Sequence, residues 1–354
     1  MYKRQVARIH HRLKENPIIA KQADNGKIKV VRYKSENLIE PLVKDILSAE
    51  LRGSVCVLTY TNDEALQVSG LLLKNGMPAQ LIQDNSGFCL LKLDEINFFL
   101  SRLHSVEDIF LIDDDVWEQA KKELQTVFQN SSKLESCLGL IRDFETINPK
   151  RRYKSDLELF IRESKLNDFF GESGETIFVS TIHKVKGKEF DHVFLMLNNF
   201  NLSSDERIRQ LYVAMTRARR DLTIHLNSDF LDGLSSEDVE YMEDKIDYSP
   251  PEELAIHLTH SDIWLDYFIQ RQPQIARIRS GDTLYVREDE CLDGNGQSVL
   301  KFSRNFMSEH YERLHRQGYE LKRAMVNFIV YWQSEKVAKE IKIILPELFF
   351  ERKK

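Results

Sequence analysis

The chain has 354 residues, of which 42% are hydrophobic and 30% are charged. This balance is ordinary for a protein with a packed core, and it excludes disordered, collagen-like and disulfide-scaffold chains. Fifty Lys and Arg against 56 Asp and Glu give a net charge of −6, so no whole-molecule basic footprint for nucleic acid exists, although 1–14, 183–188 and 207–220 are locally basic.

The first hundred residues alternate between strand and helix patterns. β-Branched and apolar runs indicate strands buried on both faces, and apolar residues at helical spacing lie between them. Asn62 and Asp63 are suited to cap the second helix. We expect strands at 27–33, 54–60 and 78–83, and helices at 36–51, 62–74 and 94–104. This order is typical of a parallel sheet covered by helices.

Residues 105–172 differ because they are helical in pattern, acidic at first, and contain no convincing strand. They predict a helical subdomain inserted into the sheet domain. The strand–helix pattern then resumes, with strands expected at 176–183, 190–197 and 221–226 and a helix over 205–219.

Residues 229–272 are acidic at first and broken by Pro250-Pro251, which indicates a linker with helices. Short alternating strands with tight turns follow, at 282–287, 298–302, 325–332 and 340–344, and they predict a small β-barrel. The expected division is therefore a sheet domain over 1–104 and 173–228, an insertion over 105–172, a linker over 229–272 and a barrel over 273–354.

The sequence shows no signal for a metal site or for a membrane segment. The four cysteines are far apart and form no CxxC pair, so we expect neither a zinc site nor a disulfide framework. No apolar run approaches the roughly 20 residues that cross a bilayer, and the basic start lacks a signal-like apolar stretch. We therefore expect a cytoplasmic protein with no metal site and no membrane partner.

Two segments carry chemistry, at 179–190 and 211–220. The first is a strand that ends in Thr181 and His183 and continues into a loop with Gly187 and Glu189. Ligands bind at such strand ends in open α/β sheets. Gly187 would let backbone approach a ligand, and Glu189 could accept hydrogen bonds from a ribose hydroxyl. The second segment is an amphipathic helix end with three arginines, where helical spacing places Arg217 near Arg220.

Each segment also has a purely structural interpretation. A lysine-rich loop is usually a solvated surface, and arginines at a helix end often only complement the helix dipole. The presence of both segments, in this order and within an intact sheet pattern, favours the functional interpretation.

Together the two segments resemble motifs V and VI of the superfamily 1 helicases of the UvrD/Rep/PcrA type. The stretch from Val57 to Asn62 also resembles a segment of this family, and the resemblance covers about 5–105 and 172–227. The residues that match motifs V and VI are Thr181, Ile182, His183, Lys186, Gly187, Glu189, Phe190, Tyr212, Val213, Ala214, Thr216, Arg217 and Ala218.

The resemblance implies a second RecA-like helicase domain with assigned roles. Arg217 corresponds to the catalytic arginine finger, which reaches the γ-phosphate and contributes about 10³–10⁵ in rate. Gly187 and Glu189 correspond to nucleotide-facing residues, together with Arg217. The residues that correspond to single-stranded DNA contacts are Asn62, Thr181 and His183.

Two residues depart from the family pattern. Lys188 replaces the usual leucine, and Tyr60 replaces a DNA-contacting arginine. Tyr60 could stack on a base or simply pack.

The sequence lacks a G-x-x-x-x-G-K-[ST] loop and a convincing Mg²⁺-binding strand end; Asp113–Asp115 more plausibly cap a helix. We therefore expect the C-terminal part of an ATP-dependent DNA helicase acting in DNA repair, on single-stranded or partly duplex DNA. ATP and Mg²⁺ belong to the full-length enzyme, and none is held by this chain alone, which we expect to be inactive. The first RecA-like domain would come in cis or from a separate subunit. The alternative is a helicase-derived, non-catalytic DNA- or protein-binding module.

Two regions keep open interpretations. The insertion occupies the position of the family's 2B subdomain in reduced form, or is a packing elaboration. The barrel loosely resembles Tudor-like domains, and a protein partner could bind an aromatic face of Tyr285, Phe302, Tyr331 and Trp332, unless these side chains are core.

Overall fold

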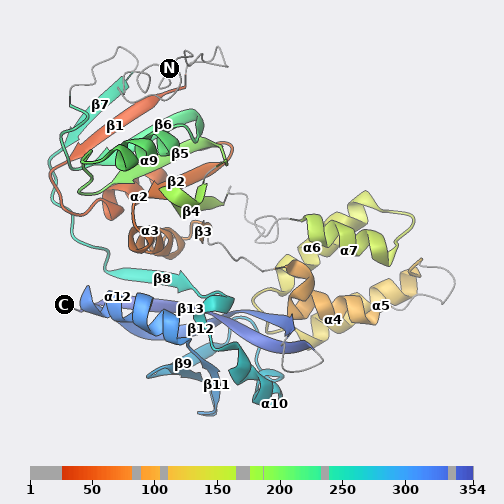
Figure 1. Ribbon diagram of the computed structural model, residues 1–354. Coiled ribbons are helices and arrows are strands. Elements are labelled where there is room, and N and C mark those ends of the chain that lie inside the picture. Colours follow the sequence, from red (N-terminus) through yellow and green to blue (C-terminus); the bar gives the residue numbers. More distant parts are fainter. Residues whose placement is uncertain are drawn as a thin grey trace. The chain divides into compact units, whose positions relative to one another are not determined.

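The computed structural model describes residues 26–81, 89–103, 111–164, 176–185, 187–232, 239–333 and 340–353. The chain forms two compact units, and each has its own sheet (Figure 1). The first unit consists of residues 1–85 and 174–254, and the second of residues 86–173 and 255–354. Among the described residues, no helix combines the length and the apolar character needed to cross a membrane.

The first unit is built on a seven-stranded parallel sheet, in the order β3-β4-β2-β5-β6-β1-β7. The predicted α/β fold with a RecA-like parallel sheet is confirmed. The strands are β1 (Ile28–Tyr33), β2 (Val55–Thr59), β3 (Ala79–Leu81), β4 (Ile177–Thr181), β5 (Phe190–Leu197), β6 (Ala218–Leu226) and β7 (Val239–Asp244).

Helices cover both faces of this sheet (Figure 1). Helix α9 (Asp205–Met215) packs on one face, where Ile224 and Leu226 of β6 join its hydrophobic cluster. His225 lies between them and points to the opposite face, because neighbouring strand residues alternate. There it meets Asp45 of helix α2 (Ile39–Ser48), which packs beside helix α3 (Asn62–Lys74).

The cap of α3 differs from the prediction. Thr61, rather than Asn62 or Asp63, is the N-cap: its hydroxyl accepts from the Glu64 amide at 3.2 Å, and the Glu64 carboxylate accepts from the Thr61 amide at 2.9 Å. This reciprocal pair is a capping box, which satisfies two amides that the helix leaves free. Asn62 and Asp63 are therefore the first helical residues.

The second unit contains a six-stranded sheet in the order β11-β10-β9-β12-β13-β8, built around the long antiparallel pair β12–β13. The predicted C-terminal β region, small and barrel-like, is confirmed. Its strands are β8 (Glu253–His257), β9 (Thr283–Arg287), β10 (Glu290–Leu292), β11 (Ser298–Lys301), β12 (Tyr319–Gln333) and β13 (Glu340–Arg352).

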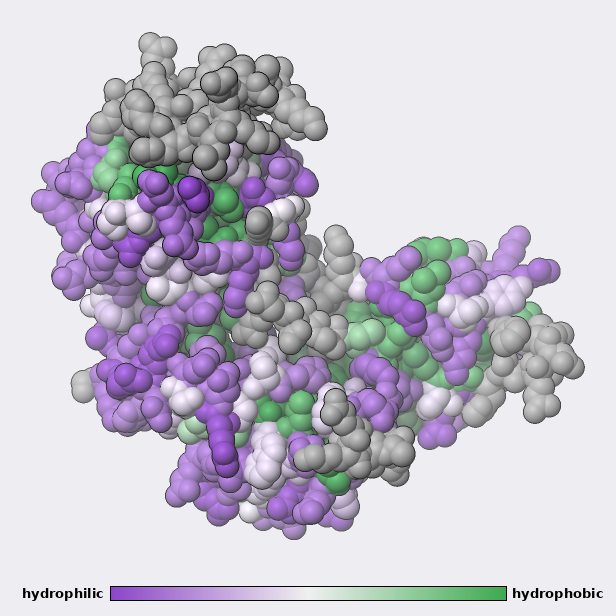
Figure 2. Space-filling model, viewed as in Figure 1, coloured by the Kyte–Doolittle hydropathy of each residue, from purple (hydrophilic) through white to green (hydrophobic). Residues whose placement is uncertain are grey.

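Four helices of the second unit come from the middle of the chain: α4 (Asp94–Arg102), α5 (Asp114–Val127), α6 (Leu134–Ile147) and α7 (Lys154–Glu163). Trp117 is fully buried and contacts Phe99 edge-on and Phe144 in a stack. The visible face of the molecule is mostly hydrophilic, with apolar patches over these helices (Figure 2). Ile147 of α6 and Leu159 of α7 are exposed apolar side chains.

Shorter helices complete the second unit. They are η1 (Leu90–Lys92), η3 (His260–Asp262), η4 (Leu265–Gln270), α10 (Gln272–Ile275), α11 (Arg304–Phe306), η5 (Met307–Tyr311) and α12 (Glu312–Arg316).

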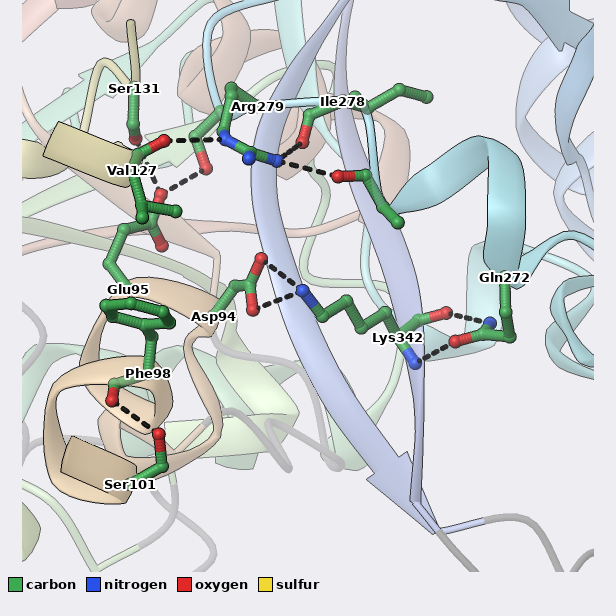
Figure 3. A network of polar contacts seen from close by, with 12 residues as sticks. Asp94, Glu95, Phe98, Ser101, Val127, Ser131, Gln272, Ile278, Arg279 and Lys342 are labelled. Carbon is green, nitrogen blue, oxygen red and sulfur yellow. Dashed lines mark hydrogen bonds and ion pairs between the residues drawn. The ribbon is translucent and has the colours of Figure 1, made fainter. Parts of the chain in front are cut away.

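Helix α4 is anchored on the C-terminal sheet (Figure 3). Asp94 is only 2% exposed, and one of its carboxylate oxygens lies 2.7 Å from Nζ of Lys342 on β13. Leu93 forms a β-bridge with Val330 of β12. A buried carboxylate must be paired, so this ion pair fixes the helix to the sheet.

These contacts differ from the expected division of the chain. Residues 89–103, which were expected in the sheet domain, belong by contact to the second unit, because α4 packs on β12. The expected linker over 229–272 contains β7, which pairs with β1, and β8, which joins the sheet beside β13. Strand β7 lies at the edge of its sheet and is mostly exposed, which accounts for its polar sequence.

Candidate functional site

The predicted site residues lie at the two opposite ends of the strands of the seven-stranded sheet. The side where the strands end is called the carboxyl edge, and the side where they begin is called the amino edge. Strands β4 and β5 run parallel, with β2 between them. The connection over 182–189 must therefore travel from the carboxyl end of β4 to the amino end of β5. It does so with a single helical turn, η2 (Ile182–Val185), and is shorter than the dozen residues of a usual crossover. This one segment reaches both edges.

The three predicted DNA contacts lie at the carboxyl edge. Thr181 is the buried last residue of β4 and pairs in register with Thr59 of β2. Asn62 is exposed at the start of α3, immediately beyond β2, and His183 is exposed in η2. The structure thus brings Asn62, Thr181 and His183 to the ends of two adjacent strands. Of these, Asn62 and His183 are open to solvent.

The predicted nucleotide-facing residues lie at the amino edge. Gly187 is exposed and has a φ of +86°, a conformation that L side chains rarely adopt, although a Cβ there would meet no atom within 4 Å. The glycine is needed for the backbone and not for space. The side chain of Glu189 is 55% exposed, with Oε2 3.6 Å from Nε of Arg219.

Arg217 lies between helix α9 and strand β6. Its Nε donates to the carbonyl of Val213 at 2.8 Å, its Nη1 to the carbonyl of Lys188 at 2.9 Å and its Nη2 to the hydroxyl of Thr216 at 3.1 Å. Its own carbonyl accepts from the amide of Phe190 at 2.8 Å. Arg217 is thus joined directly to the loop that carries Gly187 and Glu189.

The expected spacing of the arginines was wrong in one respect. Helix α9 ends at Met215, and β6 begins at Ala218, paired with Phe190. Helical spacing therefore does not relate Arg217 to Arg220. Arg219 lies beside Glu189.

A turn next to this edge depends on another glycine. The backbone amide and the hydroxyl of Ser54 both donate hydrogen bonds to Oδ2 of Asp191 at 2.9 Å. The hydrogen bond from the backbone amide is the main cause that lowers the pKa of that carboxyl. Gly53 has a φ of +104°, and a Cβ there would lie 2.6 Å from the same oxygen. Gly53 and Asp191 together set the start of β2 beside β5.

The donor set fits one side of a nucleotide and not a complete site. A guanidinium, a carboxylate and a glycine meet at the amino edge. Among the residues that the structure describes, no group of three His, Cys, Asp or Glu side chains could hold a metal ion.

An aromatic binding face was one of two open interpretations of the β region, and the four aromatic side chains do not form it. Phe302 is core, with 3% exposure, whereas Tyr285 is 60% exposed. Tyr331 and Trp332 are adjacent on β12 and so point to opposite faces of the sheet.

Residues 106–229 match the family model of the UvrD-like helicase C-terminal domain. This part of the chain is similar to the C-terminal region of UvrD-type superfamily 1 helicases. The predicted relationship is confirmed, because the matched range contains both segments singled out in the sequence. The UvrD-type region has residues in both compact units, since 106–173 belongs to the second and 174–229 to the first.

A relative supports the same assignment. A stretch of 62 residues is 39% identical to the RecBCD enzyme subunit RecB of Chlamydia pneumoniae. The match spans 17% of this chain and 6% of that protein.

Proposed function

We propose that the chain works as the C-terminal part of an ATP-dependent DNA helicase or translocase, on single-stranded or partly duplex DNA. In this proposal the UvrD-type region supplies an arginine finger at its amino edge and contacts to the DNA strand at its carboxyl edge. The observation that carries the proposal is the 182–189 connection, because one short segment touches both edges. A change at either edge would be transmitted through it.

The proposed division of labour follows from side-chain chemistry. Mg²⁺–ATP, held by a first RecA-like domain in cis or in a separate subunit, supplies the free energy of phosphoryl transfer. Arg217 carries a permanent charge in a planar fork that suits phosphate oxygens. Glu189 would accept from the ribose, and the backbone at Gly187 would lie close to the nucleotide. His183 and Asn62 would donate to the DNA backbone, which dominates strand affinity.

We expect the chain alone not to hydrolyse ATP, because its sequence has no phosphate-binding loop. A cytoplasmic location and a role in DNA repair belong to the same proposal and rest on the family resemblance. A protein partner for the C-terminal β region is also proposed, without an assigned face.

The experiment is the DNA-stimulated ATPase of the natural protein that contains this chain. Arg217→Ala should lower kcat by about 10³-fold or more while DNA affinity without nucleotide stays unchanged. Arg220→Ala is the matched control, since it removes an exposed arginine from the same segment. Equal rates for wild type and Arg217→Ala would refute the finger.

The second candidate is a non-catalytic DNA- or protein-binding module. It is favoured by one observation: Nε, Nη1 and Nη2 of Arg217 all donate within the chain, which alone accounts for an arginine there. An antibody raised against this chain separates the candidates through the mass of the native polypeptide. A native protein heavier by a further domain, about 150 residues, supports the helicase. A native mass of 41.6 kDa, with no ATP-binding subunit co-purifying, supports the module.

A further inference from the structure

We propose that Arg207 is an additional strand-binding residue, a cation held by the rings of Tyr60 and Phe200 for a backbone phosphate of single-stranded nucleic acid. The inference deepens the proposed function and rests on its DNA-binding part. No motif in the sequence pointed to this residue.

Arg207 is held in place from two directions. Its guanidinium carbon lies 5.4 Å from the centroid of the Tyr60 ring and 5.7 Å from that of Phe200. The two rings meet edge-on, with centroids 5.4 Å apart. Nη1 donates to the side-chain and main-chain oxygens of Asn201. Rings and amide together hold the guanidinium without neutralising its charge.

The charge of Arg207 is not matched by an acid. Within the described ranges, no carboxylate lies at ion-pair distance from Arg207, whereas Arg32 and Arg152 each pair with an aspartate. In the same ranges only Nη1 donates hydrogen bonds, so Nε and Nη2 are open to a ligand. Two open N–H groups on a planar cation suit the oxygens of one phosphate.

The location agrees with the candidate strand contacts. Tyr60 directly follows β2, two positions before Asn62, and Phe200 follows β5, the neighbouring strand. Arg207 therefore stands at the carboxyl edge, where Asn62 and His183 are also exposed. Proteins bind single strands with a cationic track beside aromatic or guanidinium planes. Tyr60 thus supports a cation in addition to packing on the core.

The acidic neighbours of Arg207 do not cancel this charge. Asp205 and Glu206 precede it in the first turn of α9. Successive helix residues are turned by about 100°, so the two carboxylates leave the axis in other directions. Glu206 accepts a hydrogen bond from Gln210, one turn further along α9.

The test is the affinity of the 354-residue chain for oligo(dT) at several salt concentrations. Arg207→Gln should weaken binding about tenfold at low salt and reduce the salt slope by about 0.7, the value for one phosphate of a single strand. The matched control is Arg209→Gln, which removes an exposed charge from the same helix. Its affinity should stay within about twofold of wild type.

Arg207→Lys keeps the charge and should restore the salt slope, with weaker binding because the planar fork is lost. If Arg207→Lys does not restore the salt slope, the inference is overturned. This holds even if Arg207→Gln lowers thermal stability, because the lysine variant is compared with wild type directly. If Arg207→Gln and Arg209→Gln weaken oligo(dT) binding equally, the effect is one of general charge, and the inference is overturned as well. If Arg207→Gln binds like wild type while His183→Ala weakens binding, only this inference fails. If the wild-type chain binds no oligo(dT), the DNA-binding part of the proposed function fails with it.

Discussion

Nη1 of Arg217 donates a hydrogen bond to the carbonyl oxygen of Lys188 at 2.9 Å. This bond joins the end of α9 to the loop before β5, so the two segments that matched the helicase motifs hold one another. A phosphate offers the guanidinium an ionised acceptor in place of a neutral carbonyl, so charge–charge attraction adds to the hydrogen bonds. A phosphate at the amino edge would therefore compete with the carbonyl of Lys188 for the guanidinium, while the hydrogen bond from the Phe190 amide to the Arg217 carbonyl would remain.

The same bond predicts a loss of stability when Arg217 is replaced. Arg217→Ala removes three hydrogen bonds of a half-buried side chain, which should cost about 1–3 kcal/mol in the free energy of unfolding. Urea unfolding of the 354-residue chain measures this difference. Arg220→Ala should change stability by less than about 0.5 kcal/mol, because its side chain is exposed. A neutral Arg217→Ala would show that the three bonds are not kept in solution.

Stability should also depend on pH through His225. This side chain is fully buried, with Nδ1 2.8 Å from the Tyr33 hydroxyl and Nε2 3.4 Å from a carboxylate oxygen of Asp45. Burial lowers its pKa and outweighs the opposite effect of Asp45. Below about pH 6.5 His225 is protonated in the unfolded chain but stays neutral in the folded chain. The free energy of unfolding therefore falls as the pH falls towards the pKa of His225 in the folded chain.

Urea unfolding at pH 7.5 and pH 5.5 measures this effect. His225→Gln should shrink the difference between the two values, whereas His183→Gln, at an exposed position, should leave it in place. The prediction fails if His225→Gln keeps the full acid loss.

Asp45 adds a second loss at lower pH. Burial would raise the pKa of its carboxyl, but the hydrogen bonds and charges of His225 and Lys29 lower it to about 2. This stabilisation is present above the ordinary pKa of 3.8 and disappears as the pH falls from there through about 2. Asp45→Asn should flatten the stability curve over that window. A curve as steep as that of wild type would exclude the carboxylate as its source.

Gly53 and Gly76 form a matched pair for substitution by alanine. Both have positive φ, +104° and +75°, so both variants pay about 1 kcal/mol or more in backbone strain. Only at Gly53 would the new Cβ also collide with Asp191, at 2.6 Å. Gly53→Ala should therefore lose about 1–3 kcal/mol more than Gly76→Ala in urea unfolding, because Asp191 must release Ser54. Equal losses would mean that Asp191 moves aside freely.

The buried ion pair of the second unit predicts a coupled response. Lys342→Met leaves the carboxylate of Asp94 buried without its cation and should cost about 3 kcal/mol. Asp94→Asn combined with Lys342→Met should recover part of this loss, since no isolated charge remains. Unfolding of Asp94→Asn alone, Lys342→Met alone and the double variant gives the coupling energy. Additive single effects would show that the two side chains do not interact.

The sequence predicted best where the pattern was local. The β-branched runs at 27–33 and 54–60 became β1 and β2 within a residue at each end. Strand β7 was missed, because Val239–Asp244 is acidic and mostly exposed and needs only one neighbour. The cap at Thr61 was misplaced by one residue, although Glu64 three positions later carries the capping-box signal.

Long-range placement could not be read from the sequence. The two motif segments were found, but their position at opposite sheet edges depends on the strand order β4-β2-β5. Arg207 was missed because its ring partners come from two other strand ends. The pairing of α4 with β13 joins Asp94 and Lys342, which are 248 residues apart in the chain. No local pattern encodes such a contact.

The anchoring of α4 on β12 and β13 has an evolutionary consequence. The helices from the middle of the chain and the sheet at its end are each other's packing surface, so neither keeps its buried face covered without the other. Divergent relatives are expected to gain or lose the two segments together. A relative with only the helices should carry polar residues at the positions of Leu93 and Val330, and sequencing such relatives would reveal the coinheritance.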